Sequence, residues 1–167
     1  MKSRVLRLGA IAICCASCAA PALAHGDPHH AGQPAAAASF EQKSFGIAAL
    51  PANARRTITV SMGDDMRFTP DTLTVRRGET VRIRIRNQGK VLHEMVLGSA
   101  AELREHAELM KKFPNMEHDE PHMAHVPPGA TGQIVWTFNR DGEVSFACLL
   151  PGHSEAGMVG RIKVLGQ

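Results

Sequence analysis

The stretch FACLLPGHSEAGMVG, residues 146–160, decides how the end of this chain folds. Its first residues are apolar and have the composition of a strand end, and a second strand-like segment starts at Met158. Between them lie Pro151, Gly152 and Gly157, and proline and glycine are residues that favour tight turns. The stretch therefore predicts two neighbouring strands that are joined by a short, rigid loop.

The same loop carries three different metal-binding side chains at even intervals. Cys148, His153 and Met158 each follow the previous one by five positions. Thiolate and thioether sulfurs suit Cu(I), and imidazole suits copper in both oxidation states. A second imidazole from a neighbouring strand would complete a site of two histidines and one cysteine with a weak axial methionine. That ligand set is typical of a mononuclear blue-type copper centre.

His93, in VLHEMVLG (residues 91–98), is the best candidate for the fourth ligand. It lies in a predicted strand that follows an arginine-rich strand and a turn. The other histidines lie in a low-complexity arm, in a predicted helix or in a long loop. The predicted metal ligands are therefore His93, Cys148, His153 and Met158.

From Arg55 onward the chain alternates apolar and polar residues, as half-buried strands do. The clearest case is TVRIRIRN (residues 80–87), in which Val81, Ile83 and Ile85 fall on one face and three arginines on the other. Further strand-like runs are RRTITVSM, MRFTPDTLTV with a break at Pro70, TGQIVWTF, EVSFAC and MVGRIKVL. About seven short strands of this kind predict an all-β fold of the β-sandwich type.

One segment departs from the strand pattern. SAAELREHAELMKKF, residues 99–113, starts with Ser99 and has Glu102 three positions later, which is a capping box. It predicts one helix inserted between strands. A shorter helix is expected near residues 45–50, and Trp136, the only tryptophan, is expected in the core.

The N-terminus has the features of a secretory signal peptide: a basic start, an apolar run too short to span a bilayer, and small residues that end at Ala24. We expect cleavage after Ala24 and export to the periplasm. A lipoprotein modified at Cys18 is a disfavoured alternative, because Cys15 stands where an aliphatic residue would be expected.

Cleavage would leave a chain with one cysteine and no excess charge. Three of the four cysteines lie in the signal segment, so Cys148 would be a lone thiol in an oxidising compartment, where metal ligation would protect it. The signal also removes three of the nineteen basic residues, which leaves sixteen against sixteen acidic ones. This balance does not suggest nucleic acid or a membrane surface as a partner, and we expect no membrane span.

Residues 55–165 resemble the cupredoxins, and the residues that carry the resemblance are His93, Cys148, His153 and Met158. The family includes plastocyanin, azurin and the copper-tolerance proteins called CopI, and the chain looks most like the last group. The resemblance implies an eight-stranded Greek-key sandwich with one copper ion beneath one end. It also implies that electrons pass through the ring edge of His153.

Two features depart from the family pattern. Glu94 follows the first ligand histidine, where many members have Asn or Ser that braces the loop and supports the thiolate. The gap between Cys148 and His153 is also longer than the corresponding gap in plastocyanin. The resemblance therefore predicts the ligands but not the hydrogen bonds behind them.

A second group of donors lies in PNMEHDEPHMAHVPP, residues 114–128, which we expect to be a loop. Methionine favours Cu(I) and histidine binds Cu(II), so a second, weaker copper site is one interpretation, and a solvated polar loop is the other. The segment HGDPHHAGQPAAAAS, residues 25–39, repeats the theme, and its first histidine would become the N-terminus after cleavage. The candidate ligands of this second site are Met116, His118, His122, Met123, His125, His25, His29 and His30.

The predicted organisation is a signal peptide over residues 1–24, a mobile arm over 25–54 and one cupredoxin domain over 55–167. The extra donors favour copper tolerance over pure electron transfer, which gains nothing from them. The alternative is a soluble carrier whose respiratory or oxidase partner docks near His153. We expect a monomer that is not an enzyme. A nucleophilic-cysteine enzyme would not need Met158, and a multicopper oxidase needs His-X-His pairs, which are absent here. A binuclear copper site is also disfavoured, because it needs a second cysteine on the loop.

Overall fold

The structure is a computed structural model, and it describes residues 40–113 and 119–166. Its elements are β1 (Gln42–Lys43), β2 (Gly46–Ala48), a 3₁₀-helix (Pro51–Asn53), β3 (Arg56–Gly63), β4 (Arg67–Thr69), β5 (Thr72–Arg76), β6 (Thr80–Asn87), β7 (His93–Gly98), α1 (Ala100–Lys112), β8 (Met123–Val126), β9 (Thr131–Thr137), β10 (Gly142–Ala147) and β11 (Val159–Leu165). No helix in these two ranges is long and apolar enough to cross a membrane.

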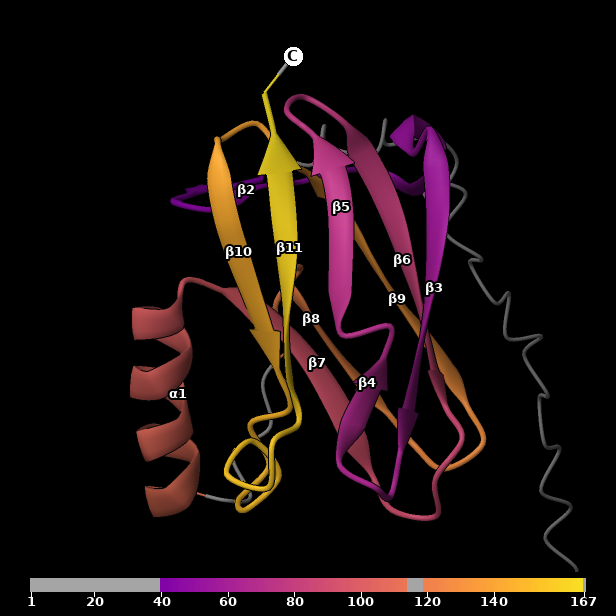
Figure 1. Ribbon diagram of the computed structural model, residues 1–167, viewed down its shortest axis with the longest axis vertical. Coiled ribbons are helices and arrows are strands. Elements are labelled where there is room, and N and C mark those ends of the chain that lie inside the picture. The colour runs from indigo at the N-terminus through magenta and orange to yellow at the C-terminus, as the bar shows by residue number, and fades with distance from the viewer. Residues whose placement is uncertain (1–39, 114–118, 167) are drawn as a thin grey trace, which may run out of the picture. The chain divides into compact units, whose positions relative to one another are not determined.

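The strands form two sheets that pack face to face (Figure 1). One sheet has the order β1-β2-β9-β6-β3-β4 and the other β5-β11-β10-β7-β8. The predicted all-β Greek-key sandwich with one inserted helix is confirmed. The described residues contain eleven strands rather than eight, because short strands such as β1, β4 and β8 are added at the sheet edges.

The core lies between the two sheets, and β6 shows why the sequence places it there. Val81, Ile83 and Ile85 are fully buried, whereas the arginines between them face outward. β6 pairs in parallel with β3 and antiparallel with β9, so its apolar row becomes continuous with theirs. Trp136 of β9 is 1% exposed, which confirms its expected place in the core.

The sequence prediction is wrong for the segment before β3. Residues 45–50 were expected to contain a helix, but residues 46–48 form β2, which pairs with β9. Trp136 Nε1 donates a hydrogen bond to the carbonyl of Phe45 at 3.1 Å, and Phe45 is buried. Gly46 has φ +131°, and a Cβ there would collide with the Trp136 ring and the Thr137 carbonyl. The described end of the predicted mobile arm is therefore packed on the sandwich.

Helix α1 forms as its capping box predicts. The Ser99 side chain accepts a hydrogen bond from the Glu102 backbone, and the Glu102 side chain accepts one from the Ser99 backbone. Leu103 and Met110 are the buried residues of the helix, and they pack on a small apolar cluster that includes Leu149. The helix thus covers the outer face of the five-stranded sheet beside β10 (Figure 1).

The predicted loop over residues 114–128 also needs correction. Residues 123–126 form β8, which pairs antiparallel with β7 and forms an edge of the sheet. Met123 and Val126 are buried, and this burial stabilises a strand whose sequence, MAHV, has no clear alternation.

Candidate metal centre

Three predicted ligands come together at one end of the sandwich. His93 is the first residue of β7, and Cys148 follows the last residue of β10. β7 and β10 are neighbours, with Ala147 opposite Val96, so their ends place the two side chains close together. His153 lies in the loop between β10 and β11, at the end where the β6–β7 connection also lies (Figure 1).

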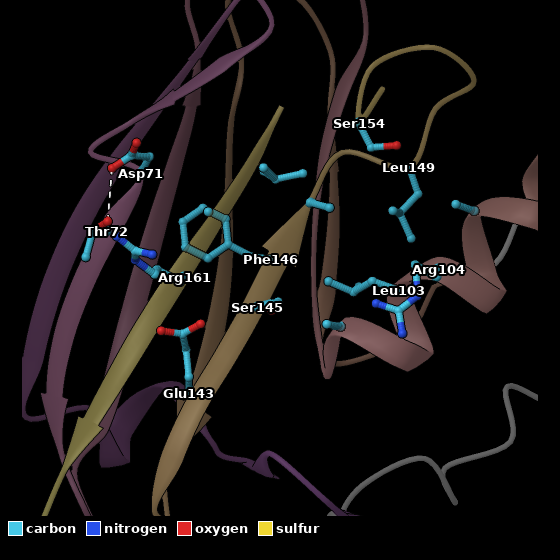
Figure 2. A pocket seen from close by; sticks show the side chains of 15 residues that line it. Asp71, Thr72, Leu103, Arg104, Glu143, Ser145, Phe146, Leu149, Ser154 and Arg161 are labelled. Carbon is cyan, nitrogen blue, oxygen red and sulfur yellow. Dashed lines mark hydrogen bonds between the residues drawn. The ribbon is translucent and has the colours of Figure 1, made fainter. Parts of the chain in front are cut away.

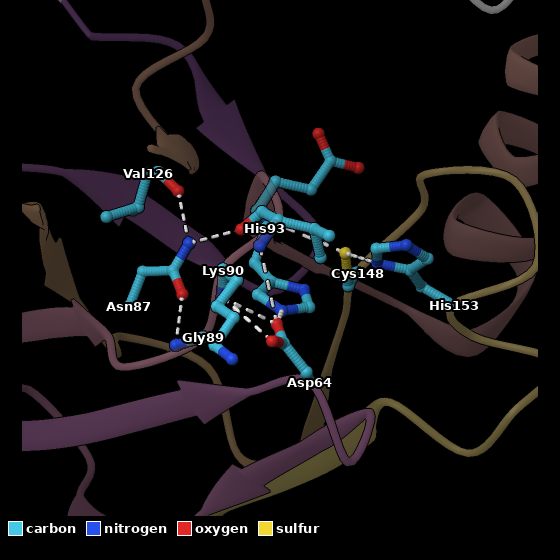
Figure 3. Close-up of polar contacts among 10 residues, drawn as sticks. Asp64, Asn87, Gly89, Lys90, His93, Val126, Cys148 and His153 are labelled. Atoms are coloured by element: carbon cyan, nitrogen blue, oxygen red, sulfur yellow. Dashed lines mark hydrogen bonds and ion pairs between the residues drawn. The ribbon is translucent and has the colours of Figure 1, made fainter. Parts of the chain in front are cut away.

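The donor atoms of His93, Cys148 and His153 all lie within 4.8 Å of one another. Cys148 Sγ is 3.2 Å from His153 Nδ1, and the two imidazole rings are 5.1 Å apart between centroids (Figure 3). Cys148 and His93 are fully buried, whereas His153 is half-buried. The site is thus closed on the protein side and reachable from solvent through His153.

Backbone hydrogen bonds hold the ligand loop in a tight turn. The Cys148 N–H donates to the Met158 carbonyl at 3.1 Å, and the Met158 N–H donates to the His153 carbonyl at 3.0 Å. Gly152 and Gly157 take φ values of +89° and +104°, which favour glycine. Met158 is fully buried in the same apolar cluster as Cys148. Its role as the axial ligand stays a prediction.

Burial sets the protonation states of the ligands. It raises the pKa of the Cys148 thiol to about 12, and the negative charge of Glu94 adds to the rise. Burial also lowers the pKa of His153, and the neighbouring His93 lowers it further. Without metal at neutral pH, the thiol therefore keeps its proton and His153 is neutral, with a lone pair available to a metal.

Two polar side chains hold His93 and the connection before it. Asp64 Oδ1 lies 3.4 Å from His93 Nε2, and the Asp64 carboxylate also accepts the Lys90 backbone N–H, which lowers the pKa of Asp64 (Figure 3). Asn87 is buried and donates from Nδ2 to the carbonyls of Val91 and Val126, both at 2.8 Å. A carboxylate behind a histidine ligand orients its ring and raises its basicity.

The donor atoms of the site fit a copper ion. With Nε2 facing Asp64, the other ring nitrogen of His93, Nδ1, is buried and has no hydrogen-bond partner in the described part of the chain. A buried polar atom without a partner is costly and calls for an explanation such as an ion. One thiol and two imidazoles are the donors that the trigonal part of a blue-type centre uses.

A separate pocket of about 510 Å³ lies between α1 and strands β10 and β11 (Figure 2). Leu149 and Ser154 of the ligand loop line it, together with charged residues such as Arg104 and Glu143. None of the three converging ligands lines this pocket, so it is distinct from the metal centre.

The predicted second copper site is only partly within the described residues. Met116, His118, His25, His29 and His30 lie outside them. Met123 is buried in an apolar cluster, and His122 packs edge-on against Phe45 at 5.7 Å between centroids. His125 Nε2 is 2.8 Å from Glu94 Oε2. The described donors of this group therefore take part in packing and in a contact with a carboxylate, and a second copper site stays a prediction.

Asp64, Asn87 and Glu94 are the site residues that the sequence analysis did not assign. Asn87 continues the inward-facing row of β6, so a polar residue in a buried register was a usable signal. Glu94 precedes the apolar run Met95–Leu97 in a strand in which every residue is buried, which is a similar signal. Asp64 lies in an ordinary turn and gives no signal of this kind.

The sandwich and its histidine–cysteine–histidine group define a copper protein of the cupredoxin class. Residues 54–165 match the model of the copper-binding proteins of the plastocyanin/azurin family, and the chain belongs to this family. The chain is also similar to proteins described as copper-resistant cuproprotein CopI. The relative from Rubrivivax gelatinosus is 43% identical over 98% of this chain and 99% of its own length. The relative from Vibrio cholerae is 39% identical over 71% of each chain.

A solved structure gives the same picture of the fold. Auracyanin A from Chloroflexus aurantiacus, described as a "blue" copper protein, is 28% identical to this chain with a TM-score of 0.53. The match covers 65% of this chain and 97% of auracyanin A. The two proteins thus share the cupredoxin sandwich.

Proposed function

We propose that this protein binds one redox-active copper ion in a type 1 centre and acts in copper tolerance. The ligands would be His93, Cys148, His153 and, in the axial position, Met158. One observation carries the proposal: two imidazoles and one thiol converge in a closed site, where the buried His93 Nδ1 has no hydrogen-bond partner in the described residues. When bound, copper would supply one-electron exchange between Cu(I) and Cu(II). The name of the CopI relatives supports the role in copper resistance.

The protein's own contribution is a braced and mostly buried ligand set. Asp64 and Asn87 hold the His93 side, and backbone hydrogen bonds hold the loop from Cys148 to Met158. A donor set that cannot rearrange and suits both oxidation states keeps the cost of electron exchange low. His153, the half-buried ligand, offers the route between the centre and solvent.

A second candidate function is electron transfer to a protein partner that docks near His153. Val91 and Leu92, in the connection that leads to His93, are 44% and 41% exposed. Exposed apolar side chains beside a redox site favour transient docking of a partner.

The proposal includes export to the periplasm after cleavage behind Ala24, a monomeric state and no catalytic activity. The basic and apolar start of the chain supports export. Growth of a deletion strain across rising copper, aerobically and anaerobically, tests the role. If the deletion strain is copper-sensitive, and the wild-type gene restores its tolerance while the Cys148→Ser gene does not, the result would support tolerance through this centre. Normal copper tolerance with impaired respiration would overturn it in favour of the electron carrier.

Replacing Met158 by leucine is expected to keep copper bound but raise the reduction potential. The buried site keeps its shape, while leucine removes one donor and leaves a more apolar site of lower coordination number, which disfavours the more highly charged Cu(II). We expect a shift of about tenfold toward Cu(I), which is about 59 mV for one electron. Redox titration of the visible band measures it. Loss of all copper would show that Met158 is more than an axial ligand.

The predicted additional copper can be tested without disturbing the centre. Replacing His118 and His122 together is expected to lower copper stoichiometry and leave the visible band unchanged. His125 stays in place in this variant because it contacts Glu94. Elemental analysis after copper loading and desalting gives the stoichiometry, and an unchanged value would mean that these histidines hold no copper.

A further inference from the structure

Glu94 is a buried carboxylate directly beside the metal centre. It follows His93 in β7 and is 1% exposed. Its backbone N–H donates to Cys148 Sγ at 3.4 Å, so its main chain lies against the thiol. Burying an ionised carboxylate is costly unless both oxygens are paired. The side chain therefore needs partners, and the structure provides one for each oxygen.

The two oxygens of Glu94 link the ligand loop to the neighbouring strand β8. Oε1 accepts the backbone N–H of Leu149, the residue after Cys148, at 2.8 Å. Oε2 lies 2.8 Å from Nε2 of His125, whose side chain is 28% exposed. Glu94 and His125 are also directly opposite each other in the β7–β8 pairing, so the backbone places them face to face.

We propose that Glu94 and His125 are a positioning pair for the copper centre: they fix the Cys148 end of the ligand loop and lower the reduction potential. The inference rests on the proposed copper function. The carboxylate holds the Leu149 amide, and His125 holds the carboxylate in place. A negative charge beside the thiolate, in a low-dielectric interior, favours Cu(II) over Cu(I). This brace joins a buried carboxylate of β7 to a histidine of β8.

Replacing Glu94 by glutamine tests the charge. The variant keeps the size of the side chain and an oxygen for the Leu149 amide, but it removes the negative charge. Copper and the visible band should remain, while the ratio of Cu(I) to Cu(II) at a fixed potential should rise about tenfold, which is about 59 mV. Glu143→Gln is the matched control, because it removes the same charge from an exposed residue at the start of β10. Equal potentials in the two variants would overturn the tuning role.

Variants of His125 test the brace through a measurement that needs no copper. In the metal-free protein, hydrogen exchange at the Leu149 amide should be at least about tenfold faster in His125→Leu than in wild type, because local opening becomes easier. His125→Gln can still donate to Oε2, so it should restore both slow exchange and the wild-type potential. Unchanged exchange and potential in His125→Leu would overturn the pairing. If wild type itself showed no thiolate–copper band, the proposed function would fail, and the exchange experiment would still decide the brace.

Discussion

Replacing Cys148 by serine is expected to remove the strong visible band that arises from thiolate-to-copper charge transfer. The sulfur is the one thiol that the described residues contain, and it lies 3.2 Å from His153 Nδ1. A serine hydroxyl is a hard donor that keeps its proton at neutral pH, so it replaces the thiolate neither as a ligand nor as a chromophore. Copper affinity should fall by more than about 100-fold, beyond the loss that removal of an outer partner of a ligand causes.

The variant should stay folded, because serine is close to cysteine in size and the Glu94 N–H can donate to its oxygen as it does to the sulfur. Circular dichroism of the metal-free protein checks this point. Ser154→Ala is the control, since it changes a hydroxyl in the same loop that bonds only to Glu155 among the described residues. An unchanged visible spectrum in Cys148→Ser would refute the proposed centre.

The convergence of His93, Cys148 and His153 could be predicted from sequence because it depends largely on local spacing. Cys148, His153 and Met158 lie on one short loop, so turn residues and strand ends suffice to bring them near one another. His93 required only that its strand be a neighbour of β10, which the family resemblance implied and the pairing of β7 with β10 confirms. The alternation in β6 likewise predicted the sandwich, since burial on one face of a strand has a period of two.

The hydrogen bonds behind the ligands could not be predicted in this way. The contact of Asp64 with His93 joins a turn to a strand end 29 positions away, and no pattern in either segment marks it. β2 was missed because its formation depends on the fit of Gly46 against Trp136, a contact between residues 90 positions apart in the sequence. β8 was missed because MAHV has no clear alternation and stands in a segment rich in polar residues and proline, so the strand depends on its pairing with β7.

The burial of the thiol has a consequence for copper binding itself. Because burial raises the pKa of Cys148 to about 12, the thiol carries a proton throughout the neutral range in the metal-free protein. Copper binds the thiolate, so each binding event must release that proton. His153 does not add to this release near neutral pH, because its pKa is lowered and the ring is already neutral there.

The apparent affinity for copper should therefore rise with pH by about tenfold per unit between about pH 7 and pH 9, because one proton leaves for each ion bound. The sign follows from the raised pKa: the proton that competes with copper is present below about 12 and becomes scarcer in solution as pH rises. Competition with a chelator of known pH dependence measures the slope. Cys148→Ser should lose most of it, since copper then displaces no thiol proton. A flat profile in wild type would mean that the thiol is already ionised before copper arrives, and would contradict the raised pKa of Cys148.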